Sequence, residues 1–134
     1  MAIEVTAGQV HESTQFESVV ATFIASRKNK RRKKPRKLAA DKGYSVQRIR
    51  DWLKALGIHA VIPHKSNETA RHDPKVKFDR EAYKRRAVIE QCVGWLKECR
   101  RIGTRFEKLA VNFHGMLQLA MIRRYLKLLF SDRA

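Results

Sequence analysis

The sequence is poor in acidic residues and contains no long apolar run. It has 13 Asp and Glu side chains against 30 Lys and Arg in 134 residues, which gives a formal net charge of +17. The excess positive charges repel one another in the folded chain, so we expect a polyanionic partner that neutralises them. Nucleic acid is the first expectation, and an anionic membrane surface is the alternative. Arg123, Arg124 and Lys127 interrupt the C-terminal apolar stretch, and no segment reaches the ~20 apolar residues that span a bilayer. We expect no membrane-spanning segment.

Cysteine is also scarce, which argues against a disulfide framework. Cys92 and Cys99 are seven residues apart on one predicted helix, ~10 Å along its axis and too far for a disulfide, so we expect buried thiols. His59, His64 and His72 lack the close ligand pairs of a zinc site. The N-terminus has no charged and then apolar leader. The expected location is the cytoplasm, in association with the nucleoid.

Length and charge distribution predict one domain with two irregular segments. A chain of 134 residues has room for a single modest core. Residues 27–37 carry Lys or Arg at nine of eleven positions, and such like charges repel, so we expect a loop unless phosphate is bound. A DNA clamp, a nuclear import signal and a flexible insertion remain open for it. Residues 64–78 are polar and aperiodic, which predicts a loop that becomes ordered on binding. We expect Lys65 in this loop to bind phosphate.

The remaining pattern predicts an α/β fold with three short strands and about four helices. We expect strands at residues 2–6, 38–40 and 58–62. The helices should cover residues 14–26, starting with a capping box at Thr14, 45–56, capped by Ser45 and ended by Gly57, 79–100, capped by Asp79, and 112–130. Each helix has apolar residues at three- and four-residue spacing, which predicts a buried face. For the third helix this face is Val88, Ile89, Cys92, Val93, Trp95, Leu96 and Cys99, and for the last it includes Met116, Leu119, Ala120, Leu126 and Leu129.

Four polar side chains of the third predicted helix fall within a ~60° arc at the helical period: Tyr83, Arg86, Glu90 and Lys97. One carboxylate in a basic row suits metal-assisted phosphoryl transfer on DNA, because the acid holds a divalent ion and the cations hold phosphate. Asp41 follows the strand at 38–40, at the end where open α/β sheets place their ligands. The alternatives are that Asp41 caps a turn and that Glu90 forms an i,i+4 pair with Arg86.

These residues carry a resemblance to a known family. The spacing Tyr83-x2-Arg86-x3-Glu90-x6-Lys97 resembles the signature helix of insertion-sequence DDE transposases. The run at residues 38–44, Leu-Ala-Ala-Asp-Lys-Gly-Tyr, resembles the strand that carries their second catalytic aspartate. Residues 8–12, 60–63 and 90–108 are similar to the C-terminal part of transposases in the insertion sequence five group. The resemblance covers nearly the whole chain and implies a ribonuclease H-like α/β fold.

The resemblance also implies roles for individual residues. Asp41 matches the second and Glu90 the third catalytic acid, which would bind Mg²⁺ or Mn²⁺. Tyr83, Arg86 and Lys97 would contact DNA phosphates, with Lys65 more distant. The first acid has no counterpart, because no aspartate precedes Asp41.

We therefore expect residues 1–134 to be a single C-terminal portion of a transposase catalytic domain, truncated at its N-terminus and inactive alone. Its expected partners are the DNA of transposon ends and an upstream transposase half or the full-length transposase. Two other functions remain open. One is a non-catalytic DNA-binding protein that represses transposition, and the other is an unrelated basic nucleic-acid binder, such as a ribosomal protein. Alanine at Asp41 or Glu90 separates them, since it should abolish metal-dependent cutting and leave mere binding intact.

Overall fold

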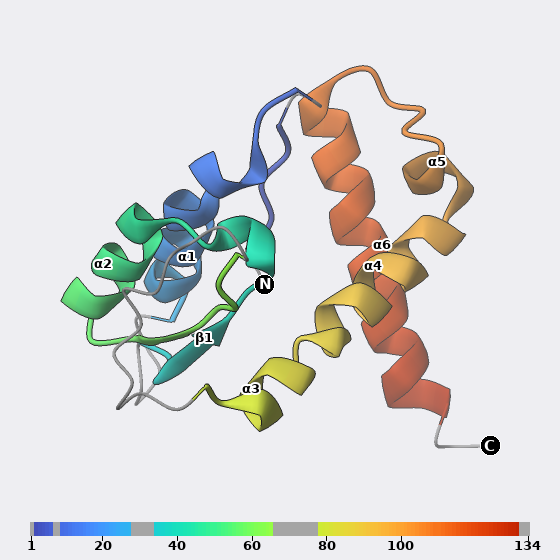
Figure 1. Ribbon diagram of the computed structural model, residues 1–134. Coiled ribbons are helices and arrows are strands. Elements are labelled where there is room, and N and C mark those ends of the chain that lie inside the picture. The colour runs from blue at the N-terminus through green and yellow to red at the C-terminus, as the bar shows by residue number, and fades with distance from the viewer. Residues whose placement is uncertain (1, 7–8, 28–33, 66–77, 132–134) are drawn as a thin grey trace. The chain divides into compact units, whose positions relative to one another are not determined.

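A computed structural model describes residues 2–6, 9–27, 34–65 and 78–131 (Figure 1). These residues form a mixed α/β structure that is mostly helical and has one two-stranded sheet. The chain divides into two compact units, Met1–Ala2 with Gln9–Ala87 and Ile3–Gly8 with Val88–Ala134, here named unit 1 and unit 2. None of the helices described is long and apolar enough to cross a membrane.

The sheet of unit 1 joins two parallel strands through a helix. Strand β1 (Lys37–Ala39) pairs with β2 (His59–Val61), and Leu38 lies opposite Ala60. Parallel neighbours require a crossover connection, which here contains α2 (Gln47–Ala55). The predicted strands at residues 38–40 and 58–62 are confirmed, with shifted or shorter bounds.

The core of unit 1 is built from the apolar faces of its two longer helices and the residues around the strands. Helix α1 (Phe16–Ala25) contributes Phe16 and Val20, and α2 contributes Ile49 and Leu53, both of them 0% exposed. The same cluster includes Ala40, Ile58 and Ile62. Burying a large aliphatic side chain stabilises a fold by about 1.5–3 kcal/mol. The buried faces predicted for these two helices are confirmed.

The predicted helix caps of unit 1 are wrong because both hydroxyls bond elsewhere. A 3₁₀ turn, η1 (Glu12–Thr14), precedes α1, and the Thr14 hydroxyl donates to the carbonyl of His11 at 2.8 Å. Ser45 is buried, and its hydroxyl accepts from the Arg50 guanidinium at 2.9 Å. The N-cap of α2 is Val46, which has no capping side chain. The predicted stop at Gly57 agrees with its left-handed φ of 70°.

Residues 2–6 do not form the predicted strand. They are described without regular secondary structure. A strand is defined by hydrogen bonds to a neighbouring strand. The carbonyl of Thr6 instead accepts from a side chain, the guanidinium of Arg105, at 2.8 Å within unit 2. The alternating pattern of these residues is therefore insufficient without a paired partner.

The helix predicted at residues 79–100 is interrupted. It consists of α3 (Arg80–Lys84), α4 (Ala87–Glu98) and then α5 (Arg100–Gly103). At the first break the N–H of Arg86 donates to the carbonyl of Tyr83 at 3.0 Å, a three-residue spacing that tightens the helix end. The predicted cap is confirmed, because the Asp79 carboxylate accepts from the N–H of Ala82 at 2.9 Å.

Unit 2 leaves most of its predicted core face exposed. On α4, Val88 and Ile89 are 61% and 63% exposed, and α4 has no buried residue. The long helix α6 (Ala110–Ser131) confirms the last predicted helix, but its predicted packing is wrong at Leu119, Leu126 and Leu129, which are exposed. The residues buried in this unit include Ile102 and Leu117.

Both cysteines are free thiols and are half-buried, so the prediction of buried thiols is correct only in part. Cys92 contacts Met121 of α6, with 3.8 Å between the sulfurs. The two predicted loops, 27–37 and 64–78, fall mostly on residues 28–33 and 66–77, which lie outside the described residues. Lys37, at the end of the first, is the initial residue of β1.

Candidate functional site

Asp41 lies just beyond the carboxyl end of β1, as the sequence predicts. Its carboxylate accepts from the N–H of Lys42 at 2.6 Å and caps the 3₁₀ turn η2 (Lys42–Tyr44). The residue is exposed. Asp41 thus has the capping contact of the structural alternative, and it also remains accessible at the edge of the sheet where ligands of α/β folds bind.

Tyr44 interacts with two carboxylates, those of Glu12 and Asp41. The Tyr44 hydroxyl donates to the carboxylate of Glu12 at 3.2 Å. Burial is the main cause that raises the pKa of Tyr44, and the negative charges of Glu12 and Asp41 raise it further. Sequence reasoning gave neither Glu12 nor Tyr44 a role of its own. The contact depends on how η1 and η2 pack, which no local pattern reveals.

Arg50 is a second residue that sequence reasoning missed. Its guanidinium donates to the hydroxyl of Ser45 and to the carbonyls of Ile62 and Pro63, at 2.9, 3.0 and 3.4 Å. One side chain from α2 therefore fixes the backbone that follows β2. Because the strands are parallel, this is also the edge at which Asp41 follows β1.

Tyr83 and Arg86 lie together in unit 1. The Arg86 guanidinium is 5.3 Å from the centre of the Tyr83 ring, within the range of a cation–π contact. The Tyr83 ring also lies beside Phe78, at 5.4 Å between ring centres. Asp79 fixes this segment, since its carboxylate binds the ammonium of Lys37 on β1 at 2.6 Å.

The pKa of the Asp79 carboxyl lies below its ordinary value. The hydrogen bond from the N–H of Ala82 is the largest cause, and the hydrogen bond and charge of Lys37 add to it. A lowered pKa means that the fold favours the ionised carboxylate.

Glu90 and Lys97 lie on α4 in unit 2, and both are exposed. Tyr83 and Arg86 precede the helix break and belong to unit 1. The predicted ~60° arc required a single continuous helix, so the continuous row of four side chains is wrong. Asp41 and Glu90 likewise belong to different units.

Lys65 is half-buried and is the last described residue before 66–77.

The carboxylate oxygens of Asp41 and Glu90 are the ligand type that Mg²⁺ and Mn²⁺ prefer. Across residues 2–6, 9–27, 34–65 and 78–131, no group of three or more His, Cys, Asp and Glu side chains is arranged to hold a metal ion. Of the two predicted ligands, Asp41 belongs to unit 1 and Glu90 to unit 2. Their chemistry fits a divalent ion, and their number requires further oxygen donors.

Comparison with known proteins decides the family. The family described as "Transposase DDE domain" matches residues 1–124. The chain belongs to the DDE transposase family. A relative from Burkholderia cepacia, described as "Putative transposase for insertion sequence element IS402", is 30% identical over 117 residues, which cover 86% of this chain and 51% of the relative. No solved structure matches the chain.

This DDE transposase chain therefore spans about half the length of the curated relative that it matches. The family agrees with the resemblance to DDE transposases that the sequence carries.

Proposed function

We propose that this chain belongs to the insertion sequence five group, is part of a ribonuclease H-like catalytic domain, and acts in DNA transposition by binding transposon ends for strand cleavage and transfer. The observation that carries the proposal is the family match over residues 1–124. The position of Asp41 at the carboxyl end of a parallel strand supports it.

In this proposal Asp41 and Glu90 are catalytic residues that hold Mg²⁺ or Mn²⁺. The metal, when bound, supplies Lewis acidity that activates an attacking oxygen and stabilises the leaving one. Tyr83, Arg86 and Lys97 bind phosphates of the DNA backbone, and Lys65 binds a phosphate farther along. The Arg86–Tyr83 contact limits the rotation of the guanidinium, which lowers the entropy lost on binding.

The proposal includes inactivity of the isolated chain. Within residues 1–134 no aspartate precedes Asp41, and in this proposal an upstream transposase half or full-length transposase supplies the first family acid. The exposed apolar residues Val88, Ile89 and Val93 on α4 suit such a partner, because contiguous apolar surface marks interaction sites. The proposed location is the cytoplasm, on nucleoid DNA.

Substitutions in a reconstituted enzyme test the catalytic roles. The chain is combined with the upstream half, and cutting of transposon-end DNA is measured with Mg²⁺ and with EDTA. We expect Asp41→Ala and Glu90→Ala to reduce cutting to background and to leave DNA binding unchanged or slightly tighter. The matched control is Asp51→Ala, which removes an exposed carboxylate of α2 that bonds to Gln47. Equal cutting by all three variants would show that the acids are not catalytic.

A second candidate is a non-catalytic repressor that coats transposon ends. The observation in its favour is that Asp41 has a structural use, since it caps η2. The isolated chain added to full-length transposase separates the two functions. Repression predicts that cutting falls as the chain saturates the DNA, and that Asp41→Ala represses as well as the parent chain does.

A further inference from the structure

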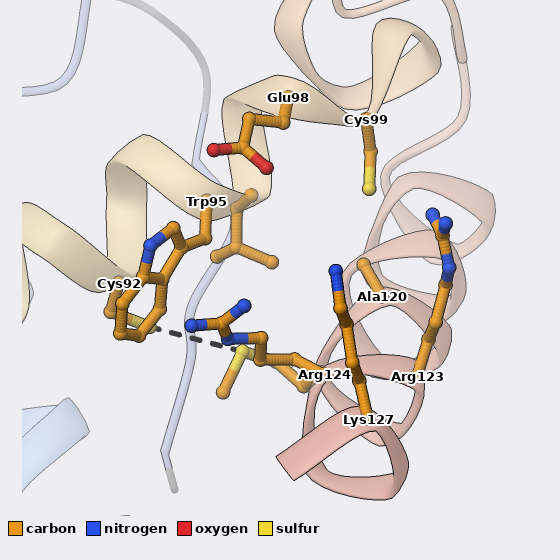
Figure 2. Close-up of a pocket in the computed structure, with 10 residues that line it drawn as sticks. Cys92, Trp95, Glu98, Cys99, Ala120, Arg123, Arg124 and Lys127 are labelled. Carbon is orange, nitrogen blue, oxygen red and sulfur yellow. Dashed lines mark hydrogen bonds between the residues drawn. The ribbon is translucent and has the colours of Figure 1, made fainter. Parts of the chain in front are cut away.

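A pocket between α4 and α6 in unit 2 has not entered the proposed function. Its volume is about 230 Å³, and its lining includes Trp95 and Glu98 of α4 and Cys99, the residue that follows this helix. Helix α6 contributes three cations, which Figure 2 shows on one side of the pocket: Arg123, Arg124 and Lys127. All three side chains line this one pocket.

The charges of the lining favour an anion. Three cations oppose one carboxylate, that of Glu98. Cations held this close repel one another, and a bound anion would remove that repulsion. The pocket is therefore chemically suited to a compact group with negative charge and several acceptor atoms.

Arg124 is held in place by an aromatic ring and keeps an unused donor. Its guanidinium lies 3.9 Å from the centre of the Trp95 ring, a close cation–π contact (Figure 2). Its Nε is buried and has no hydrogen-bond partner among the residues that the structure describes. The Trp95 ring therefore orients the Arg124 guanidinium at the pocket.

We propose that this pocket binds a phosphate group of the DNA backbone, with Arg124 held by Trp95 and with Arg123 and Lys127 completing the charge. Phosphate offers the acceptor oxygens that a guanidinium binds best. A volume of about 230 Å³ is below the ~300–1,000 Å³ of typical small-molecule sites, and it suits a phosphate better than a whole nucleotide. The inference rests on the proposed binding of DNA and adds a contact made by cations of α6.

Paired charge removals test the pocket. The double variant Arg123→Gln/Lys127→Gln removes two pocket cations, and its control Arg100→Gln/Lys108→Gln removes two exposed cations of unit 2 outside the pocket. Affinity for a transposon-end duplex is measured by fluorescence anisotropy at several salt concentrations. We expect about a tenfold loss for the pocket variant and at most about twofold for the control, with the salt slope lower by about 1–2 in the pocket variant. Equal losses would overturn the pocket assignment.

Failure of the pocket and failure of the proposed function give different results. If the parent chain binds DNA and both double variants bind equally, the pocket assignment alone is wrong. If the parent chain does not bind DNA at all, both proposals fail.

Trp95 provides a direct readout of occupancy. In a Trp52→Phe background, Trp95 is the remaining tryptophan, and we expect DNA to shift its emission. The further change Arg124→Gln should abolish that shift, whereas Lys108→Gln should preserve it. A shift with poly-glutamate or inorganic phosphate and none with DNA would overturn the assignment, because the ligand would then be an acidic polypeptide or free phosphate.

A substitution at Glu98 tests the pocket in the opposite direction, because it should increase the affinity for DNA. Glu98→Gln removes the one carboxylate of the lining, so DNA should bind severalfold more tightly. Its control is Glu81→Gln on α3, an exposed acid outside the pocket that pairs with Lys84. Equal gains for the two variants would contradict a specific site between α4 and α6.

Discussion

Lys37 and Asp79, 42 residues apart in sequence, are joined at 2.6 Å between ammonium and carboxylate. Lys37 is the first residue of β1, and Asp79 is the N-cap of α3. The same carboxylate therefore caps the start of a helix and attaches it to the sheet. This attachment positions the segment that carries Tyr83 and Arg86 within unit 1.

Asp79→Ala should lower the melting temperature more than Asp79→Asn. Alanine removes both the cap and the ion pair, whereas asparagine keeps an oxygen that can accept from the N–H of Ala82. Lys37→Gln isolates the ion pair and should match Asp79→Asn. Thermal unfolding followed by circular dichroism checks the order, and equal melting temperatures for the alanine and asparagine variants would show that the cap contributes nothing.

The Asp79 carboxylate should make stability depend on acidic pH. Its pKa is lowered in the folded state, so its contribution is present above the ordinary Asp value of ~3.9 and disappears as pH falls through the lower folded pKa. The stability difference between the parent chain and Asp79→Asn should therefore be constant near neutrality and shrink below about pH 4. Urea unfolding at a series of pH values measures it. A difference that grows on acidification would contradict the lowered pKa.

Leu53→Ala should destabilise unit 1 by about 2–5 kcal/mol, because Leu53 is 0% exposed and its removal leaves a cavity. Leu119→Ala, at a leucine that is 61% exposed, should change stability by less than about 0.5 kcal/mol. Urea unfolding followed by Trp52 fluorescence in a Trp95→Phe background reports on the first, and circular dichroism on both. A large loss of stability in Leu119→Ala would show that the face of α6 carrying Leu119 is covered.

Gly103→Ala should destabilise unit 2. A Cβ at Gly103 would lie 2.7 Å from the backbone oxygen of Lys97, so α5 would have to move away from the end of α4. Overpacking of this kind costs about 1–3 kcal/mol. Gly94→Ala is the control, because nothing lies within 4 Å of its new Cβ and alanine favours the helix by up to about 1 kcal/mol. Thermal melting of the two variants should shift in opposite directions.

Hydrophobic periodicity predicted the helices and strands that the local sequence specifies. Helices α1, α2 and α6, both strands and the stop at Gly57 follow the sequence closely, because local spacing and backbone preference determine them. The strand at residues 2–6 failed because pairing requires a partner. The cap at Ser45 failed because its hydroxyl instead accepts from Arg50.

For the candidate site, the residue types and their family spacing were readable from the sequence, and the family match agrees with them. The sequence did not reveal that the helix carrying Tyr83, Arg86, Glu90 and Lys97 is interrupted. This break depends on backbone hydrogen bonding at residues 83–86. The pocket cations Arg123, Arg124 and Lys127 were noted only as interruptions of an apolar stretch.

The sequence by itself thus determined the charge, the family and the positions of Asp41 and Glu90 relative to their elements, since these depend on composition and on local order along the chain. The tertiary structure decided which side chains share a site: Lys37 with Asp79, Tyr44 with Glu12, and Arg124 with Trp95. These pairs join residues 29 to 42 positions apart, and the free energy of such contacts depends on packing that no short window of sequence contains.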